Sequence, residues 1–314
     1  MKKILVTGGA GFIGSNLIKT LIKSDNYIIA LDNLCTGNLK NIEYLTSRKN
    51  FEFIKHDIIN PIDIKADEIY NLACPASPDK YQIDSEFTFK TSVFGVYNLL
   101  QLAKKYNAKF LQASTSEVYG NPRVHPQNEE YSGNVNCIGI RACYDEGKRA
   151  SETLISDFTK KYGIKTKIAR IFNTYGPNMD KNDGRIISNF INQALENKDI
   201  TIYGTGEQTR SLCYIDDTVN GLIKLMNSSD EINFPINIGN TDERTVKNIA
   251  DIVLNLTSSK SDLTYTKPHA DDPLRRCPDI TKAEKFLNWE PVVNLEEGLK
   301  RTIKYFKDIK TNNE

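Results

Sequence analysis

The segment VTGGAGFIGSNL near the start of the chain constrains the fold more than any other part of the sequence. It places Gly8, Gly11 and Gly14 between an apolar strand, Lys3–Thr7, and an amphipathic helix over Ile13–Lys23. A glycine turn at such a junction lets backbone N–H groups and the helix N-terminus approach a pyrophosphate. Glycines alone are a weak signal, because a tight turn that binds no nucleotide can have the same composition.

An acidic residue at the end of the second strand strengthens this interpretation. The strand Tyr27–Asp32 ends in Asp32, which is placed to accept hydrogen bonds from the adenosine ribose and to repel a 2′-phosphate, so NAD is favoured over NADP. Asp57, after the strand Phe51–Lys55, could reach the adenine amine, although a solvated loop would also explain it. We expect the neighbouring loop residues to complete the NAD site: Phe12, Ile13, Asn33, Thr36, Gly37, Ile58, Leu72 and Ala73.

The first half of the chain alternates apolar strands with helical patterns. The other predicted strands are Glu68–Ala73, Lys109–Ala113 and Lys165–Ile171, and the other predicted helices are Thr91–Tyr106 and Ala150–Tyr162. Continuous aliphatic runs between amphipathic helices predict an α/β protein with a doubly wound parallel sheet of the Rossmann type. We predict an NAD-binding domain over residues 1–175, with a returning segment at about 212–238, and a smaller ligand-binding domain from 176–211 and 239–314.

Composition excludes several classes of function. The 314 residues are 39% hydrophobic and 26% charged with a net charge of +1, so we expect a globular protein that binds neither nucleic acid nor a membrane surface. The six cysteines form no C-x-x-C pair, and His56, His125 and His269 are far apart, so we predict no metal site. We find no signal peptide and no apolar run near twenty residues, and we expect a cytoplasmic protein.

Tyr144 and Lys148 in RACYDEGKR form a candidate catalytic pair. On a helix this spacing places both side chains on one face, where the ammonium is expected to lower the pKa of the phenol. Such a tyrosine can take a proton from a hydroxyl while a hydride leaves the same carbon. Tyr-x-x-x-Lys also occurs by chance on exposed helix faces, and only its position after the glycine turn favours catalysis.

A run of polar residues follows the strand Lys109–Ala113. Taken alone, STSEVYGNP describes a polar loop with a helix cap. In a doubly wound sheet, however, ligands bind at the carboxyl ends of the strands. Thr115 is therefore predicted to contact the reacting hydroxyl beside Tyr144, and Ser116 and Glu117 to face the adjacent carbons.

The chain resembles the extended short-chain dehydrogenase/reductases throughout its length, and most closely the UDP-glucuronate decarboxylases. The resemblance rests on VTGGAGFIGSNL, DNLCTGN, NLACPASP, STSEVYG, VHPQNEEY, RACYDEGKR, ARIFNTYGP, DGRIISNFI, IYGTGEQTRS, DDPLRRCPDI and LNWEPVV. The related 4,6-dehydratases carry Asp at the position of Ser116, and the 4-epimerases usually lack Glu117. Leu212, Cys213, Cys35 and Cys137 depart from the residues more usual in the family, and we expect these departures to change affinity rather than chemistry.

The resemblance implies a reaction and a division of roles. Tyr144, with Lys148 and Thr115, would remove the C4 hydroxyl proton of UDP-glucuronate while NAD+ takes the C4 hydride. The 4-keto sugar would then lose CO2, and the return of hydride would give UDP-xylose with no net consumption of NAD. Glu117 and Arg276 are the candidates for orienting the carboxylate and managing protonation at C5. A surface salt bridge from Arg276 to Asp271 or Asp272 is the simpler alternative for that arginine.

Substrate contacts are expected mainly from the second half of the chain. Arg185 and Arg210 suit the pyrophosphate, because a guanidinium matches phosphate oxygens. The other candidates are Tyr203 and Gln208 near the uracil or ribose, Asn173 near the inner phosphate, and Pro75. The segments Glu86–Tyr106 and Ala142–Tyr162 resemble those that form a four-helix dimer contact in this superfamily, so we expect a homodimer.

Three other functions stay open from the sequence. The chain could be an NAD-dependent 4,6-dehydratase or 4-epimerase of the same family. It could also release the 4-keto pentose before hydride returns. A non-catalytic NAD-sensing or scaffold protein is the third alternative, although such proteins typically lose the tyrosine or the lysine, and both are present here.

Overall fold

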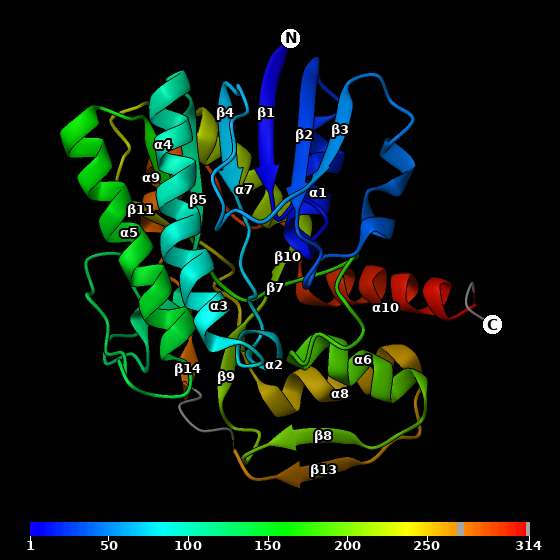
Figure 1. Ribbon diagram of the computed structural model, residues 1–314. Coiled ribbons are helices and arrows are strands. Elements are labelled where there is room, and N and C mark those ends of the chain that lie inside the picture. Colours follow the sequence, from blue (N-terminus) through cyan, green and yellow to red (C-terminus); the bar gives the residue numbers. More distant parts are fainter. Residues whose placement is uncertain (269–272, 312–314) are drawn as a thin grey trace.

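The computed structural model describes residues 1–268 and 273–311. Seven strands form one parallel sheet in the order β11-β6-β5-β4-β1-β2-β3 (Figure 1), which confirms the predicted doubly wound sheet. The strands are β1 (Lys2–Thr7), β2 (Asn26–Asp32), β3 (Phe51–Lys55), β4 (Glu68–Asn71), β5 (Lys109–Thr115), β6 (Thr166–Ile171) and β11 (Pro235–Ile238). The central residues of β1 and β2 are aliphatic and buried because helices cover both faces of the sheet.

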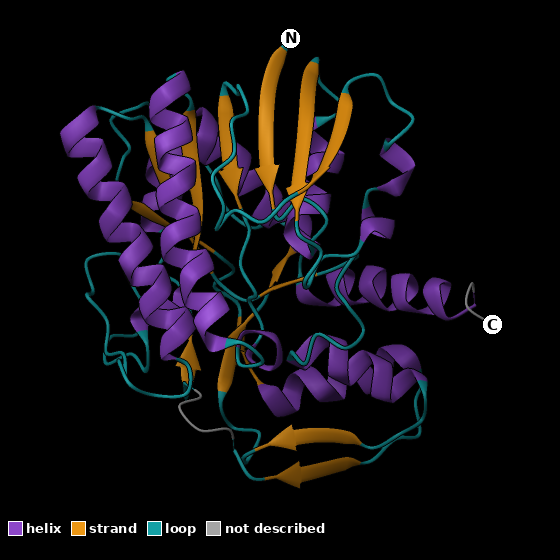
Figure 2. Ribbon diagram, viewed as in Figure 1, coloured by secondary structure: helices purple, strands orange, loops and turns teal. Residues whose placement is uncertain are grey.

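Helices cover both faces of the sheet (Figure 2). Two separate apolar clusters join them to it. Leu17 and Leu222 belong to one cluster, and Leu99 and Ile155 belong to the other. The helices that carry these residues are α1 (Phe12–Leu21) and α7 (Ile215–Asn227) on the first face, and α4 (Val96–Tyr106) and α5 (Ala142–Tyr162) on the second.

Several element boundaries differ from the predictions. The strand β5 continues through Thr115, because Ser114 and Thr115 pair with β6 in the sheet. The helical run before α4 begins earlier than predicted, at α3 (Ser85–Lys90), and passes through a π-helical turn, η3 (Thr91–Gly95). The helix α5 begins at Ala142, so it includes the Tyr-x-x-x-Lys spacing.

Smaller elements lie below the carboxyl ends of the strands in Figure 1. They form a three-stranded sheet, β12-β9-β14, and two parallel pairs, β13-β8 and β10-β7. Their bounds are β7 (Thr174–Tyr175), α6 (Ile186–Leu195), β8 (Ile200–Tyr203), β9 (Thr209–Ser211), β10 (Cys213–Tyr214), β12 (Glu243–Thr245), α8 (Val246–Thr257), β13 (Leu263–Thr266), β14 (Arg275–Arg276) and α10 (Leu295–Thr311). The helix α9 (Thr281–Leu287) lies in the upper layer instead, where it packs against β11 and α7. The short turns are η1 (Leu39–Asn41), η2 (Glu43–Leu45), α2 (Pro78–Tyr81) and η4 (Ser116–Tyr119).

The returning segment contributes α7 and β11 to the large sheet layer, while the division into two domains stays a prediction. All six cysteines are free. Within residues 1–268 and 273–311 no group of three or more His, Cys, Asp or Glu side chains is arranged to hold a metal ion. No helix in this described part of the chain is long and apolar enough to span a bilayer.

Candidate active site

A cavity of about 1640 Å³ lies at the carboxyl edge of the sheet. It collects every residue that we predicted for the site, from both halves of the chain. These are Gly8, Gly11, Phe12, Ile13, Gly14, Asp32, Asn33, Thr36, Gly37, Asp57, Ile58, Leu72, Ala73, Pro75, Thr115, Ser116, Glu117, Tyr144, Lys148, Asn173, Arg185, Tyr203, Gln208, Arg210 and Arg276. The chemical role of each residue stays a prediction.

The glycine turn forms one end of this cavity. Gly8 has a φ of +68°, and a Cβ on it would lie 2.7 Å from the backbone carbonyl of Leu72 at the end of β4. A Cβ on Gly14 would lie 2.1 Å from the Gly8 carbonyl oxygen. Only glycine fits at these two positions, and the turn leads directly into α1. This close backbone approach before a helix N-terminus fits the pyrophosphate of NAD.

Asp32 and Asp57, the two acidic residues predicted to bind NAD, also fix the loops around them. The Asp32 carboxylate accepts hydrogen bonds from the backbone N–H groups of Ala10 at 3.0 Å and Leu34 at 2.8 Å. Burial raises the pKa of Asp32, although both hydrogen bonds act in the opposite direction. Asp57 accepts from the Asn33 amide at 2.8 Å, so the loops after β2 and β3 are joined beside the cavity.

Tyr144, Lys148 and Thr115 meet where β5 ends. The Lys148 ammonium donates to the Ala113 carbonyl at 2.9 Å and lies 5.7 Å from the centre of the Tyr144 ring. The Thr115 side chain acts on the Tyr144 phenol in the direction that lowers its pKa. The helix α5 therefore presents the predicted pair to the cavity, beside the hydroxyl at the end of the strand.

The predicted lowering of the Tyr144 pKa is wrong for the protein in this state. Burial raises the pKa of the phenol well above its ordinary value, and Cys74 and Glu117 act in the same direction. Thr115 and Arg185 oppose them without reversing the effect. Burial also lowers the pKa of Lys148. Desolvation, which the spacing of the two residues does not reveal, decides the direction of both shifts.

A cluster of buried charges surrounds Glu117. We call Glu117, Arg141, Asp145 and Arg276 the cavity cluster. Glu117 Oε2 accepts from a guanidinium nitrogen of Arg141 and, at 3.1 Å, from Arg276 Nη2. Arg276 Nη1 also donates to the Ser116 carbonyl at 2.6 Å. Burial acts to raise the pKa of Glu117, but Arg276 and Arg141 outweigh it and hold that pKa below its usual value.

The buried position of Arg276 differs from the surface position that the salt-bridge alternative required. Its side chain is 1% exposed and pairs with Glu117, so it is not a surface residue. Asp271 and Asp272, the partners that alternative required, lie outside the described residues. The prediction that Arg276 acts together with Glu117 agrees with the contact between them, and its role toward a substrate stays a prediction.

The site also contains residues that the sequence analysis missed. Arg141 pairs with Glu117, and Asp145 lies one helical turn after it on α5. The Tyr81 ring stacks on Tyr144, with ring centres 5.0 Å apart and planes 4° apart, and the Tyr81 hydroxyl is buried without a hydrogen-bond partner. Arg141 could have been found from its position one turn before Asp145. No sequence pattern pointed to Tyr81.

The predicted substrate-binding residues line the same cavity. Arg185 pairs with Asp183, and Arg210 Nη1 donates to the Thr209 carbonyl at 2.8 Å. The Gln208 amide donates to the Tyr203 carbonyl at 2.5 Å. These guanidinium and amide groups line the cavity from the smaller elements, and Arg185 is close enough to act on the pKa of Tyr144.

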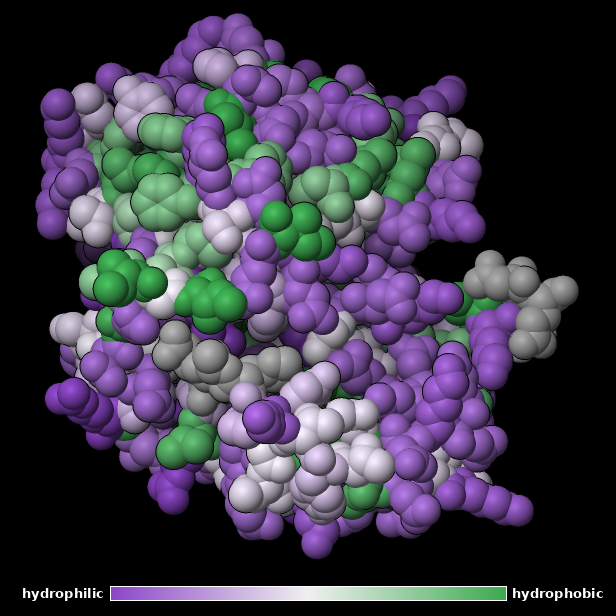
Figure 3. All heavy atoms as spheres, turned by 60° about the horizontal axis from the view of Figure 1, so that its bottom comes forward, coloured by the Kyte–Doolittle hydropathy of each residue, from purple (hydrophilic) through white to green (hydrophobic). Residues whose placement is uncertain are grey.

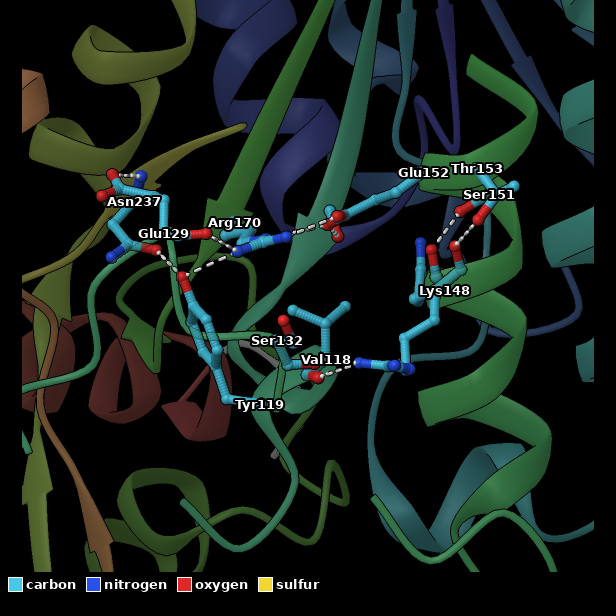
Figure 4. Close-up of polar contacts among 12 residues, drawn as sticks. Val118, Tyr119, Glu129, Ser132, Lys148, Ser151, Glu152, Thr153, Arg170 and Asn237 are labelled. Carbon is cyan, nitrogen blue, oxygen red and sulfur yellow. Dashed lines mark hydrogen bonds and ion pairs between the residues drawn. The ribbon is translucent and has the colours of Figure 1, made fainter. Parts of the chain in front are cut away.

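A second set of buried charges lies outside the cavity lining and involves α5, β6 and β11. We call Tyr119, Glu129, Glu152, Arg170 and Asn237 the Arg170 network (Figure 4). Arg170 reaches both Glu152 oxygens at 3.1 and 2.7 Å, the Tyr119 hydroxyl at 3.1 Å and the Glu129 carbonyl at 3.1 Å. The Tyr119 hydroxyl donates to Asn237 at 2.7 Å. Glu152 also accepts from Ser114, so the network reaches the end of β5.

A family model described as GDP-mannose 4,6 dehydratase matches residues 5–302. The chain belongs to this family. Two curated relatives are each 50% identical to the chain: UDP-glucuronic acid decarboxylase 1 of Danio rerio, over 97% of this chain and 72% of the relative, and UDP-glucuronic acid decarboxylase 5 of Arabidopsis thaliana, over 95% and 87%. The resemblance stated from the sequence motifs is confirmed.

Solved structures of family members share the whole fold. The UDP-glucuronic acid 4-epimerase of Bacillus cereus, in complex with UDP-glucuronic acid and NAD, is 29% identical with a TM-score of 0.90, covering 98% of this chain and 99% of that one. The UDP-glucose 4-epimerase of Thermotoga maritima, with UDP-glucose, is 30% identical with a TM-score of 0.89 and the same coverage. The fold therefore extends to epimerases, so the chemistry depends on the residues of the cavity.

Proposed function

We propose that this protein is an NAD-dependent decarboxylase that converts UDP-glucuronate to UDP-xylose through a UDP-4-keto sugar. The observation that carries the proposal is Glu117 held between Arg141 and Arg276, next to Tyr144, Lys148 and Thr115 in one cavity. Two guanidinium groups are suited to a substrate carboxylate, and the tyrosine is suited to a sugar hydroxyl. The decarboxylase names of relatives that are 50% identical support it.

NAD, when bound, accepts a hydride from C4 and returns it at the end of the cycle. Tyr144 takes the proton of the C4 hydroxyl, and the Thr115 hydroxyl orients both oxygens. Because the resulting ketone is β to the carboxylate, CO2 leaves and the electrons pass to the C4 oxygen. The protonated Tyr144 then stabilises that oxygen. C5 must gain a proton in place of the carboxylate, and Glu117 and Arg276 line this part of the cavity.

Their shared position in the cavity supports the remaining roles that we propose. Arg185 and Arg210 contact the pyrophosphate, Tyr203 and Gln208 border the uracil or ribose, and Asn173 lies by the inner phosphate. Pro75 contacts the sugar from the loop after β4. If the smaller elements bind the pyrophosphate of the substrate, its hexuronate would lie between the cavity cluster and the glycine turn.

A homodimer is part of the proposal. The exposed aromatic residues Phe89, Phe94 and Tyr97, which are 41%, 53% and 43% exposed, lie on the helical run from α3 to α4, and Tyr162 on α5 is 38% exposed. Apolar groups also gather on the upper left of the surface in Figure 3. Such a patch is suited to a partner, and a second copy of the chain would cover it. We also propose a cytoplasmic location.

The experiment that tests the activity is incubation of the purified protein with UDP-glucuronate and NAD. We expect release of CO2 and a nucleotide product with the mass of UDP-xylose. A product with the mass of the substrate, identified as UDP-galacturonate, would instead indicate a 4-epimerase. Conversion of a neutral nucleotide hexose, with no reaction of UDP-glucuronate, would also contradict the proposal.

A further inference from the structure

We propose that Gln112 is a positioning residue for Lys148, and that a buried row of hydrogen-bonded side chains joins it to the glycine turn. The inference rests on the proposed function, because it assumes that Lys148 acts beside Tyr144. Gln112 does not line the cavity, so it acts through the backbone of the next residue, Ala113.

Polar side chains from three strands stand side by side in the interior of the large sheet, and we call Thr7, Asn71 and Gln112 the buried ladder. Thr7 pairs with Asn71 between β1 and β4, and Asn71 pairs with Gln112 between β4 and β5. The Thr7 hydroxyl donates to Asn71 Oδ1 at 2.6 Å, and Asn71 Nδ2 donates to Gln112 Oε1 at 2.8 Å. Gln112 Nε2 then donates to the Ala113 carbonyl at 3.1 Å. The hydrogen bonds therefore run in one direction, from the end of β1 to the end of β5.

Packing alone does not explain these side chains. Each member of the buried ladder is at most 1% exposed, and a buried amide or hydroxyl costs free energy unless it is hydrogen-bonded. The residues two positions earlier on the same strands are apolar and pair in the same way: Leu5, Ile69 and Phe110. A fully satisfied polar network holds its members in one arrangement, and here it does so where the strands reach the cavity.

One end of the buried ladder is the acceptor of the catalytic lysine. The Ala113 carbonyl accepts from Gln112 Nε2 and, at 2.9 Å, from Lys148 Nζ. Lys148 is 3% exposed, and a buried ammonium is costly unless it is hydrogen-bonded. Because two donors fix the direction of one carbonyl oxygen, Gln112 helps to decide where the ammonium lies beside Tyr144.

The other end of the buried ladder lies at the glycine turn. Thr7 directly precedes Gly8, and a Cβ on Gly8 would lie 2.7 Å from the backbone carbonyl of Leu72, which follows Asn71. The Leu72 N–H donates to the Thr7 carbonyl at 3.0 Å. The ends of β1 and β4 therefore carry both the glycine turn and the first hydrogen bond of the ladder. The ladder sets the spacing between that turn and Lys148, and a misplacement of about 1 Å in an active site can cost about 10²-fold in rate.

The first measurement reports on Lys148 and needs no turnover. We would record NMR spectra of nitrogen-labelled lysine ammonium groups, in which Lys148 is the signal that is lost in Lys148→Arg. Gln112→Leu should shift or broaden this signal, because it removes the second donor to the Ala113 carbonyl. Asn237→Leu removes a buried, hydrogen-bonded amide from β11 of the same sheet, and as the matched control it should leave the signal in place.

A second variant tests the far end of the buried ladder. Thr7→Val keeps the shape of the side chain and removes only the first donor, so it should fold even if Gln112→Leu does not. It should change the Lys148 signal in the same way as Gln112→Leu, but by less.

The second measurement separates positioning from binding and from stability. In Gln112→Leu, kcat for CO2 release should fall about tenfold, while KM for UDP-glucuronate and Kd for NAD change by less than about twofold. A purely structural role would instead lower the unfolding temperature and leave kcat unaltered where the variant is folded, as we expect for Asn237→Leu.

The inference is overturned if Gln112→Leu and Thr7→Val both leave the Lys148 signal in place, or if Asn237→Leu changes it equally. It is also overturned if Gln112→Leu changes Kd for NAD and not kcat. A changed Lys148 signal, without CO2 release from the unsubstituted protein, would support the inference and contradict only the proposed reaction.

Discussion

Helix α5 contributes to two buried sets of charges that differ in how completely they are paired. In the Arg170 network, both Glu152 oxygens accept from Arg170, and the Tyr119 hydroxyl both donates and accepts. In the cavity cluster, two arginines share one oxygen of Glu117, and Asp145 keeps an unpaired oxygen. Only one turn of helix separates Lys148, on the cavity side, from Glu152.

The difference separates groups that hold the fold from groups that are available to a ligand. Buried polar groups in proteins are normally hydrogen-bonded, and exceptions occur where a site must do something else. The Arg170 network joins β5, β6, β11 and α5 with its hydrogen bonds satisfied inside the protein. The cavity cluster faces a large cavity with charges that a substrate can complete. Substitutions in the Arg170 network should therefore lower stability more than activity. Substitutions on the cavity side should lower activity more than stability.

The largest effect is expected from Tyr144→Phe on the cavity side of α5. Removing the hydroxyl eliminates the group that exchanges a proton with C4, so turnover should fall by about 10²- to 10⁴-fold. Because the ring is kept, stacking on Tyr81 and the unfolding temperature should change little. Initial rates of CO2 release, with NAD binding by fluorescence titration, check this. Turnover near that of the unsubstituted protein would remove Tyr144 from its role.

Arg170→Met should have the opposite profile. It leaves Glu152 as a buried carboxylate without its partner, which should lower the free energy of unfolding by about 3–5 kcal/mol. Urea unfolding followed by circular dichroism measures the loss. Adding Glu152→Gln should recover part of it, because the unpaired charge is then removed. A loss no larger than that of an exposed arginine would contradict a structural role for the network.

The pH dependence of stability should distinguish the carboxylates of the two sets. The pKa of Asp145 in the folded protein is about 7, above its unfolded value, so its contribution to stability is complete below pH about 4 and is lost as the pH rises through about 7. The free energy of unfolding of Asp145→Asn should therefore increase relative to that of the unsubstituted protein between pH 5 and 8. Parallel curves in urea would contradict this, and Asp157→Asn, the same change at an exposed position of α5, is the control.

Tyr119→Phe should have the smallest effect. It removes the hydroxyl that joins Arg170 to Asn237 and leaves the buried Asn237 Oδ1 without this donor, at a cost of about 1–3 kcal/mol. Urea unfolding gives the change, and activity at a temperature where the variant is fully folded should stay unaltered. A change in turnover without a change in stability would show that the network acts on the chemistry.

Much of the fold and part of the site could be predicted from sequence. Short-range patterns were sufficient for the parallel sheet, for the glycine turn before α1 and for the Tyr144–Lys148 spacing, because each depends on residues a few positions apart. Asp32 and Thr115 could be placed at the cavity because the carboxyl ends of parallel strands meet at one edge. The continuation of β5 through Thr115 was missed, since pairing with β6 overrides the polar character of those residues.

The tertiary structure alone decided how the charges pair and which protons they hold. Glu117 meets Arg141 across 24 residues and Arg276 across 159, and no local pattern encodes such contacts. Desolvation raises the pKa of Tyr144 and of Asp145, and it depends on how many groups from other elements exclude water. The sequence determined which chemical groups line the cavity. Their charge states follow from burial, which exists only in the folded chain.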